Sequence, residues 1–378
     1  MKVIIVGVST LPHWPGGEPV IVQHLADILN KNNIEYSKVC YNINNKKSTS
    51  ILNKIVSGNF NYEFYKELFK SEKPDLIFGF TDFDFSYIFA AGDLGIPIIY
   101  DAQIYYLLCP KWTFYYADKK FCSGSSSIKC AYCSMTTKNY LGLINAIPFN
   151  FQKNKIKKYL NKIIAPSKFV SDLLVKNGFD KNKIEVIHNS IDLDFWEFSP
   201  LKKKNKKIIV YYSSAGANKS KGFYDFIDLC KRFESTPNVD FYATAKPKSI
   251  KKPCKNLKLV GGLNQKEILK LLKNSYAVIV PALWEEPFGL VVAQAMAVGR
   301  PVLAYKSGGI SEQIKDGLTG FLVEKGDVNS LESKLKLLLD NFDMAKNMGR
   351  NGRKLAESKF DVNIMKKKYI KSILKFKL

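Results

Sequence analysis

The sequence lacks a long apolar run, and this absence excludes several classes of protein. No apolar stretch in its 378 residues approaches the roughly 20 residues that a helix needs to span a bilayer. The amino-terminal segment MKVIIVGVST has neither the longer hydrophobic region nor the small-residue cleavage site of a signal peptide, so it predicts a first β-strand. We therefore expect a cytoplasmic protein, with any membrane contact limited to peripheral association on the inner face of the cell membrane.

Acidic residues are scarce: 34 Asp and Glu stand against 58 Lys and Arg, which gives a formal net charge of +24. Such an excess fits nucleic-acid binding, attraction to anionic lipid headgroups, or a lysine-rich composition on solvated faces. The sequence shows no recognition helix, RNP-like aromatic strand or zinc-finger spacing, so we expect no nucleic-acid partner. Peripheral contact with an anionic membrane stays open.

Histidine is rare as well, with His13, His24 and His188 as the only three. His24 falls on the first predicted helix, where a structural or solvated role is expected. His13 precedes a Gly-Gly pair in a loop, and we place it on the side of the site that faces a substrate.

What the sequence does contain is ample material for a core, with 46% hydrophobic and 13% aromatic residues. Its length suggests about two domains. Short apolar runs typical of buried strands alternate with helical spacing, which predicts an α/β protein with parallel sheets covered on both faces. The predicted strands are 3–8, 38–43, 75–80, 97–101, 162–166, 184–189, 207–213, 239–245, 257–260, 276–281, 301–305 and 320–324.

A polar break, SPLKKKNKK at 199–207, divides this pattern into two doubly wound halves. We predict a first domain over residues 1–200, with an insertion at about 105–135, and a second over 205–360. The two domains would face a central cleft, where ligands bind at the carboxyl ends of the strands.

The sharpest motif is WEEPFGLVVAQAMAVGRP, residues 284–301. A predicted strand leads to an acidic turn, and Gly289 then opens a helix whose first amides lack intrahelical partners and suit a diphosphate or sugar hydroxyls. The carboxylate of Glu286 can accept hydrogen bonds from sugar hydroxyls. Gln294, two turns along the helix, can reach a second group such as a ribose.

Together with the downstream segment GGISE (308–312), this stretch resembles the signature of glycosyltransferase family 4, two glutamates separated by seven residues. Gly16-Gly17 is similar to the family's glycine loop near the donor phosphates. Residues 186–192 (VIHNSID) and 218–222 (NKSKG) are similar to the end of its first domain and to the lysine-glycine loop of its second. The resemblance covers most of the chain and implies the GT-B fold, two Rossmann-like domains with a carboxyl-terminal helix (361–378) that crosses back to the first.

The resemblance implies a retaining glycosyltransferase that moves a hexose-type sugar from a UDP-sugar or GDP-sugar to a hydroxyl of a glycan or lipid-linked glycan. Transfer in this family requires no metal. The residues implied in the catalytic region are Glu286 and Gln103, and those on the donor side are Gly16, Gly17, Lys219, Lys221, Glu286, Phe288, Gly289, Leu290 and Gln294. On the acceptor side we place His13, together with Tyr105 and Tyr106 from an aromatic-rich stretch.

Three positions depart from the family pattern. Gln294 replaces the second glutamate, Gly216 stands where an arginine usually precedes the loop lysine, and Gln103 stands where the family has a histidine. These changes keep two alternatives open: a catalytically impaired GT-B binding subunit and a nucleotide-sugar epimerase.

Four cysteines, Cys109, Cys122, Cys130 and Cys133, fall within 25 residues. Cys130 and Cys133 have the C-x2-C spacing with which two thiolates bind one tetrahedral Zn²⁺. Close cysteines in a cytoplasmic chain bind metal more often than they form disulfides, and a similar pattern occurs in a subset of family 4. Structural zinc, disulfides, an iron–sulfur cluster and free thiols all stay open.

Overall fold

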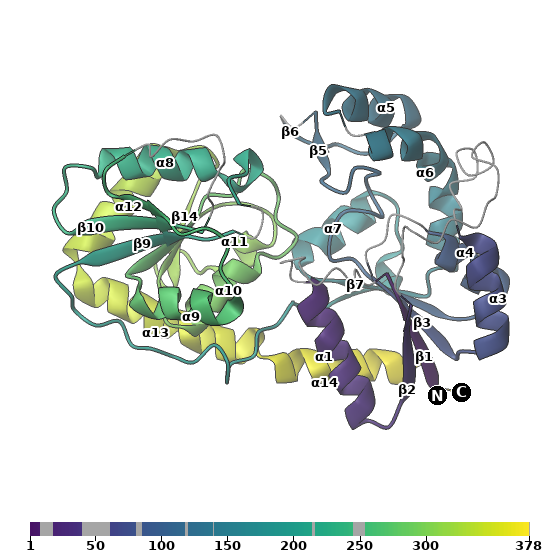
Figure 1. The fold of residues 1–378 in the computed structure, drawn as a ribbon. Coiled ribbons are helices and arrows are strands. Elements are labelled where there is room, and N and C mark those ends of the chain that lie inside the picture. Colours follow the sequence, from purple (N-terminus) through teal and green to yellow (C-terminus); the bar gives the residue numbers. More distant parts are fainter. Residues whose placement is uncertain are drawn as a thin grey trace. The chain divides into compact units, whose positions relative to one another are not determined.

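The chain forms two compact units in a computed structural model, Met1–Ile187 with Lys366–Leu378, and His188–Met365 (Figure 1). The structure describes residues 1–7, 18–39, 61–80, 85–117, 120–138, 140–213, 216–244 and 254–377. In this part of the chain, no helix is long and apolar enough to cross a membrane.

The first unit is built on a parallel sheet in the order β2-β1-β3-β4-β7-β8. Its strands are β1 (Lys2–Val6), β2 (Glu35–Val39), β3 (Leu76–Gly79), β4 (Ile98–Asp101), β7 (Lys162–Ala165) and β8 (Ile184–Val186), with a separate antiparallel pair, β5 (Tyr115–Tyr116) and β6 (Lys120–Phe121). The helices are α1 (Glu18–Lys31), α3 (Tyr62–Glu72), α4 (Ser86–Asp93), α5 (Ser127–Thr136), α6 (Tyr140–Tyr159), α7 (Lys168–Lys176) and the end of α14 (Val362–Leu374). Buried apolar runs such as IIV in β1 account for these strands, because both faces of the sheet are covered.

The second unit has a parallel sheet in the order β11-β10-β9-β12-β13-β14. Its strands are β9 (Lys207–Tyr211), β10 (Val239–Ala243), β11 (Leu257–Leu259), β12 (Ala277–Val280), β13 (Val302–Tyr305) and β14 (Gly320–Val323). The helices are α8 (Phe223–Arg232), α9 (Gln265–Asn274), α10 (Leu290–Ala297), α11 (Ile310–Gln313), α12 (Val328–Asp340) and α13 (Phe342–Lys359), with the 3-10 turn η2 (Lys219–Lys221). This is the doubly wound order 3-2-1-4-5-6, in which the direction of winding reverses between β9 and β12.

Alternate residues of these strands form two separate cores, one on each face of the second sheet. Ile209 and Tyr211 pack with α8 and α12, whereas Val210 between them packs with α9 and α10. Figure 1 shows the same two layers of helices. Because side chains alternate across a strand, one apolar run supplies both cores.

The boundary between the units lies earlier than the polar break at 199–207. Residues that follow Ile187 already belong to the second unit: Trp196 and Leu201 are buried in its two cores, and Ile191 forms a bridge with Asp361. The apolar side chains before and within the polar break therefore decide to which unit this stretch belongs.

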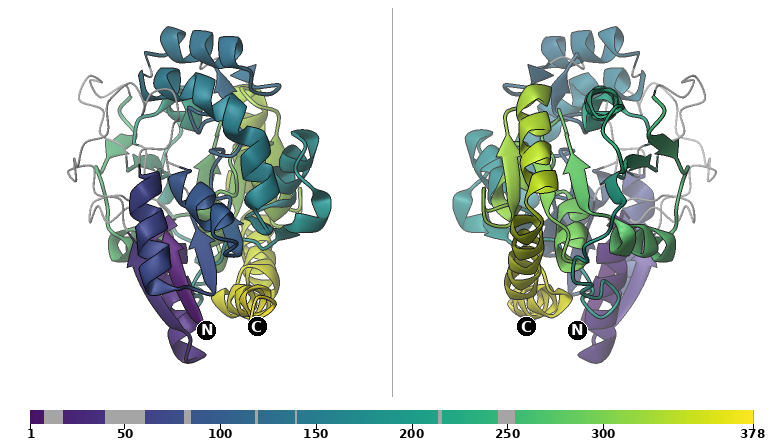
Figure 2. Two further views of the ribbon diagram at one scale, coloured as in Figure 1. Left: turned by 90° about the vertical axis from the view of Figure 1, so that its right-hand side faces the viewer. Right: turned by 90° about the vertical axis from the view of Figure 1, so that its left-hand side faces the viewer.

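The carboxyl-terminal helix α14 leaves the second unit and ends in the first. Within the first unit, the ring of Tyr369 stacks on Phe78 of β3, with 5.8 Å between ring centroids. The two ends of the chain consequently lie near each other, as the views in Figure 2 show.

Candidate functional site

Charged side chains gather at the carboxyl edge of the second sheet, next to its switch point. Lys221 lies in η2, after β9, and Glu286 lies in the turn after β12. Ser307 and Lys325 follow β13 and β14. Loops at this edge of a doubly wound sheet form its usual ligand site, so the fold brings the predicted donor residues to the expected place.

Lys221 and Glu286 form an ion pair, with 2.5 Å between Nζ and Oε1. Their side chains are 23% and 12% exposed, so the pair is partly shielded but open on one side. The Lys221 ammonium also lies 4.2 Å from the ring centroid of Trp284, a cation–π distance. The Lys221 ammonium can bind a phosphate, and the neighbouring Glu286 carboxylate can accept a hydrogen bond from a hydroxyl.

The backbone of Glu286 is held by the segment after β13. Gly309 N donates to Glu286 O at 2.8 Å, and Glu286 N donates to Ser307 Oγ at 3.2 Å. A Cβ on Gly308 would lie 2.3 Å from Glu286 O, so only glycine permits this close approach. The GGIS sequence therefore holds the backbone that carries the Glu286 carboxylate.

Glu285 stabilises the same turn from the other side. Its Oε2 accepts a hydrogen bond from Gly308 N at 2.6 Å, and its Oε1 pairs with Lys325. Sequence reasoning missed this role, because two adjacent glutamates in a turn carry no signal that separates a supporting side chain from a binding one.

The turn η2 is attached to the loop that follows β12. Leu283 N and Trp284 N both donate to Ser220 O, at 2.9 and 3.0 Å. Gly222, with φ of +72°, has no room for a side chain, since a Cβ there would lie 1.6 Å from Pro281 O. These contacts explain why a glycine follows Lys221, and they hold the lysine beside Glu286.

Gly289 precedes α10 with φ of +90°, and a Cβ there would lie 2.8 Å from Ile310 Cγ1. Leu290 is the first residue of the helix, as the sequence predicts. The ring of Phe288 is buried, and its carbonyl accepts a hydrogen bond from Gln313 Nε2. The first amides of α10 therefore follow directly on the Glu286 turn.

Gln294 is engaged by Tyr212, whose hydroxyl donates to Gln294 Oε1. Burial raises the pKa of Tyr212 well above its usual value, so this hydroxyl keeps its proton and remains a donor. Tyr212 was not predicted from the sequence. Its position directly after β9, at the switch point, is the signal that could have identified it.

Lys219 and Gly216 take no part in the ion pair. Lys219 is exposed on η2, so the structure selects Lys221 as the partner of Glu286. Gly216, the position of the missing arginine, has φ of +64° and open space where a side chain would begin.

In the first unit Gln103 is buried, and its Nε2 donates to Asp101 Oδ1 at 2.8 Å. Tyr105 and Tyr106 are 1% and 6% exposed. Their rings pack near Phe114 and Trp112, at centroid distances of 5.8 and 6.1 Å, so packing accounts for both. The predicted residues His13, Gly16 and Gly17 lie outside the described residues.

The clustered cysteines Cys109, Cys122, Cys130 and Cys133 line one small cavity of about 20 Å³, and all four are free thiols. Cys133 Sγ accepts a hydrogen bond from Ala117 N at 3.1 Å. Burial raises the pKa of Cys109 to about 12 and also raises that of Cys130. Among the described residues no three cysteine, histidine or carboxylate side chains are arranged to bind a metal. The structural zinc site that the spacing suggested stays a prediction, and the shared cavity brings its four cysteines together.

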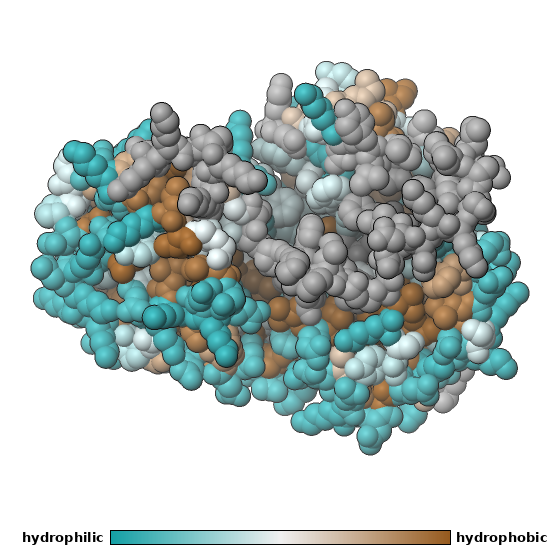
Figure 3. All heavy atoms as spheres, in the orientation of Figure 1, coloured by the Kyte–Doolittle hydropathy of each residue, from teal (hydrophilic) through white to brown (hydrophobic). Residues whose placement is uncertain are grey.

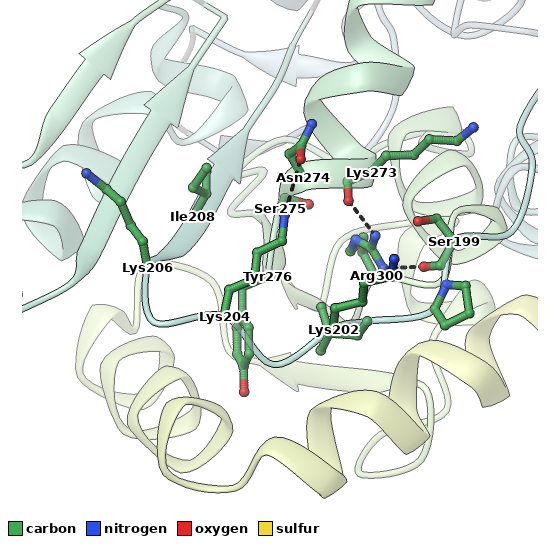
Figure 4. Close-up of a pocket in the computed structure, with 12 residues that line it drawn as sticks. Ser199, Lys202, Lys204, Lys206, Ile208, Lys273, Asn274, Ser275, Tyr276 and Arg300 are labelled. Carbon is green, nitrogen blue, oxygen red and sulfur yellow. Dashed lines mark hydrogen bonds between the residues drawn. The ribbon is translucent and has the colours of Figure 1, made fainter.

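A cavity of about 290 Å³ lies at the opposite, amino edge of the second sheet (Figure 4). Arg300 lies at its base and donates to four backbone carbonyls, those of Ser199, Leu272, Lys273 and Gly299. These bonds attach the segment before β9 to the end of α9. The cavity is therefore separate from the carboxyl edge of the sheet, and we assign Arg300 a structural role.

A family model described as glycosyl transferases group 1 matches residues 192–355, and one described as glycosyltransferase family 4 matches residues 46–195. An uncharacterized glycosyltransferase of Methanocaldococcus jannaschii is 27% identical over 210 residues, 52% of this chain and 55% of the relative. The chain spans about half the length of the curated relatives it matches.

Among solved structures, sucrose-phosphate synthase of Thermosynechococcus elongatus has a TM-score of 0.71 and 14% identity, covering 99% of this chain and 98% of that one. HepE of Anabaena in complex with UDP-glucose has a TM-score of 0.68 and 16% identity, covering 99% of both chains. These likenesses confirm the predicted GT-B fold. Each half of the chain thus matches a glycosyltransferase family model, and the two adjoining matches together span residues 46–355.

Proposed function

We propose that the protein transfers a hexose-type sugar from a nucleoside-diphosphate sugar, a UDP-sugar or GDP-sugar, to a hydroxyl of a glycan or lipid-linked glycan, with retention of configuration. The observation that carries this proposal is the Lys221–Glu286 pair at the carboxyl edge of the second sheet, beside the first amides of α10. A neighbour in fold was solved with UDP-glucose, which supports a donor of this class.

In this proposal the donor separates the ion pair. Lys221 and the first amides of α10 bind the diphosphate, and Glu286 binds hydroxyls of the sugar. The bond between the anomeric carbon and the diphosphate oxygen breaks as the acceptor oxygen bonds to that carbon. The acceptor proton passes to the departing diphosphate oxygen, whose growing negative charge Lys221 stabilises.

Thermal unfolding with UDP, GDP and ADP tests the donor site without an acceptor. At about 100 times the dissociation constant, one bound nucleotide adds about 2.7 kcal/mol to the free energy of unfolding. We expect a shift with one nucleotide, which identifies the base. The absence of a shift with all three would contradict a working donor site and favour the impaired binding subunit.

Glu286→Ala then tests the role of the carboxylate. We expect kcat/KM for transfer to fall at least about a hundredfold, because a hydrogen bond made to the reacting sugar is lost. Glu324→Ala is a matched control, since it removes the carboxylate of another ion pair at the same edge, with Lys306. Full activity in Glu286→Ala would contradict the role assigned to this carboxylate. Interconversion of the donor without transfer would favour an epimerase.

A further inference from the structure

One helix of the first unit presents an apolar face to solvent. On α5, Ile128 is 87% exposed, Tyr132 56% and Met135 60%. These positions are spaced four and three residues apart, so they form one stripe along the helix. The opposite side of α5 carries the buried residues Cys130 and Cys133. We call Ile128, Tyr132 and Met135 the α5 stripe, and Figure 3 shows apolar side chains at the surface where α5 lies.

All charged residues in the sequence around the α5 stripe are basic. Between Asp118 and Asp172 the chain has ten lysines and no acidic residue. Lys120, on β6, and Lys138, just after α5, are both exposed. Lys129 lies within α5 and donates to Ser123 Oγ at 2.8 Å. This hydroxyl does not neutralise the charge of the lysine.

Three of these ten lysines, Lys155, Lys162 and Lys168, form ion pairs with carboxylates. The combination of an apolar stripe and the remaining excess of lysines restricts what can cover this face. A second copy would bring two basic segments together, which like-charge repulsion opposes. An anionic bilayer satisfies both features, because its headgroups attract lysines, by about 1 kcal/mol each near the surface. Apolar side chains of an interfacial helix enter the boundary between headgroups and acyl chains.

We propose that the α5 stripe and its flanking lysines are the surface with which this chain docks on a membrane rich in anionic phospholipid. The helix is short and its apolar face small, so binding needs both the apolar contact and the charge and is reversible. α5 lies in the same connection between β4 and β7 as Gln103. The docking surface itself does not depend on the proposed function. Only its purpose does, which is to bring the first unit to a lipid-linked acceptor in the membrane.

Co-sedimentation of the full chain with vesicles tests the surface. We expect binding to phosphatidylcholine vesicles that contain about 30% phosphatidylglycerol at about 0.1 M salt, and its loss at about 0.5 M, where charges are screened. Ile128→Ser with Met135→Ser should weaken binding about tenfold. Leu318→Ser with Leu337→Ser, which alters two exposed leucines of the second unit, should leave it unchanged.

A second pair of variants separates local charge from net charge. Lys120→Gln with Lys138→Gln should weaken binding about thirtyfold. Lys202→Gln with Lys203→Gln makes the same change in net charge in the exposed polar segment and should weaken it only a few-fold. Equal losses in the two lysine pairs, no vesicle binding, or a change of oligomeric state in the stripe variant would each overturn the proposal. Nucleotide-induced thermal shifts in the same variants report the donor site independently.

Discussion

Tyr369 donates a hydrogen bond to the buried carboxyl of Asp101, 268 positions earlier in the chain. The other oxygen of Asp101 accepts a hydrogen bond from Gln103 Nε2. This carboxyl therefore links α14 to Gln103, which the sequence places in the catalytic region. Burial raises the pKa of Asp101 to about 7, against the opposing effect of both hydrogen bonds. The contact thus connects the end of the chain with the connection after β4.

Removing the hydroxyl of Tyr369 should destabilise the first unit. In Tyr369→Phe the carboxyl of Asp101 loses a buried donor, which costs about 1–3 kcal/mol in the free energy of unfolding. Urea denaturation at about pH 8, where Asp101 is ionised, measures the loss. Tyr224→Phe is the control, because that side chain is exposed on α8 and should change stability by less than about 0.5 kcal/mol. Equal stabilities of the two variants would contradict the assigned contact.

Asp101 should also make stability depend on pH. Its pKa is raised from 3.8 to about 7 on folding. Between these values the folded chain keeps a proton that the unfolded chain has lost, so the free energy of unfolding falls as pH rises and levels off above about pH 7. Since one pH unit corresponds to about 1.4 kcal/mol, the contribution present at low pH and lost by pH 7 is at most about 4 kcal/mol.

Asp101→Asn should remove this part of the slope. Denaturation of both proteins between about pH 4 and pH 8 measures it, because the difference between the two curves cancels the other titrating groups. Parallel curves would show that Asp101 titrates alike in the folded and unfolded chain.

The sequence predicted the second unit well because its signals there are local. The apolar run at 277–280 and Gly289 before a helical pattern specify β12 and the start of α10 without long-range information. The partner of Glu286 could not be found in this way, since Lys221 is 65 positions away and Lys219 has the same chemistry. Only the contacts of Ser220 with the loop after β12 decide between the two lysines.

The first unit was less predictable for a different reason. The aromatic stretch containing Tyr105 and Tyr106 reads equally as a surface for sugars or as core, because composition does not report burial. The predicted end of the unit lies later than the end in the structure, because Trp196, before the polar break, and Leu201, within it, pack in the second unit. Sequence spacing likewise identified the cysteine cluster but not that all four side chains line one cavity.

Gly222→Ala should disturb the site through its backbone. The new Cβ would meet Pro281 O, and its φ of +72° is strained for alanine. We expect a loss of more than about 2 kcal/mol in stability and of the nucleotide-induced thermal shift. Gly261→Ala is matched in backbone strain, with φ of +75°, but has open space around it. It should cost only about 1 kcal/mol and keep the shift, and an equal effect of the two substitutions would argue against the steric explanation.

The cysteines of the cluster should differ in reactivity. Cys122 is half-buried, whereas Cys109 is buried and has its pKa raised to about 12, so its nucleophilic thiolate is scarce at neutral pH. Brief treatment of the native protein with iodoacetamide, followed by peptide mass spectrometry, should find Cys122 alkylated first. Protection of all four until a chelator is added would instead indicate a bound metal.

The return of α14 to the first unit has a consequence for biosynthesis. The second unit is one continuous piece of chain, whereas the first needs residues from Lys366 onward to supply Tyr369 to Asp101. A ribosome therefore begins the first domain before the second but releases its last piece after the second has emerged completely. Domains generally fold as units during synthesis, so the domain that starts earlier reaches its native state later. Until then Asp101 lacks the hydrogen bond from Tyr369.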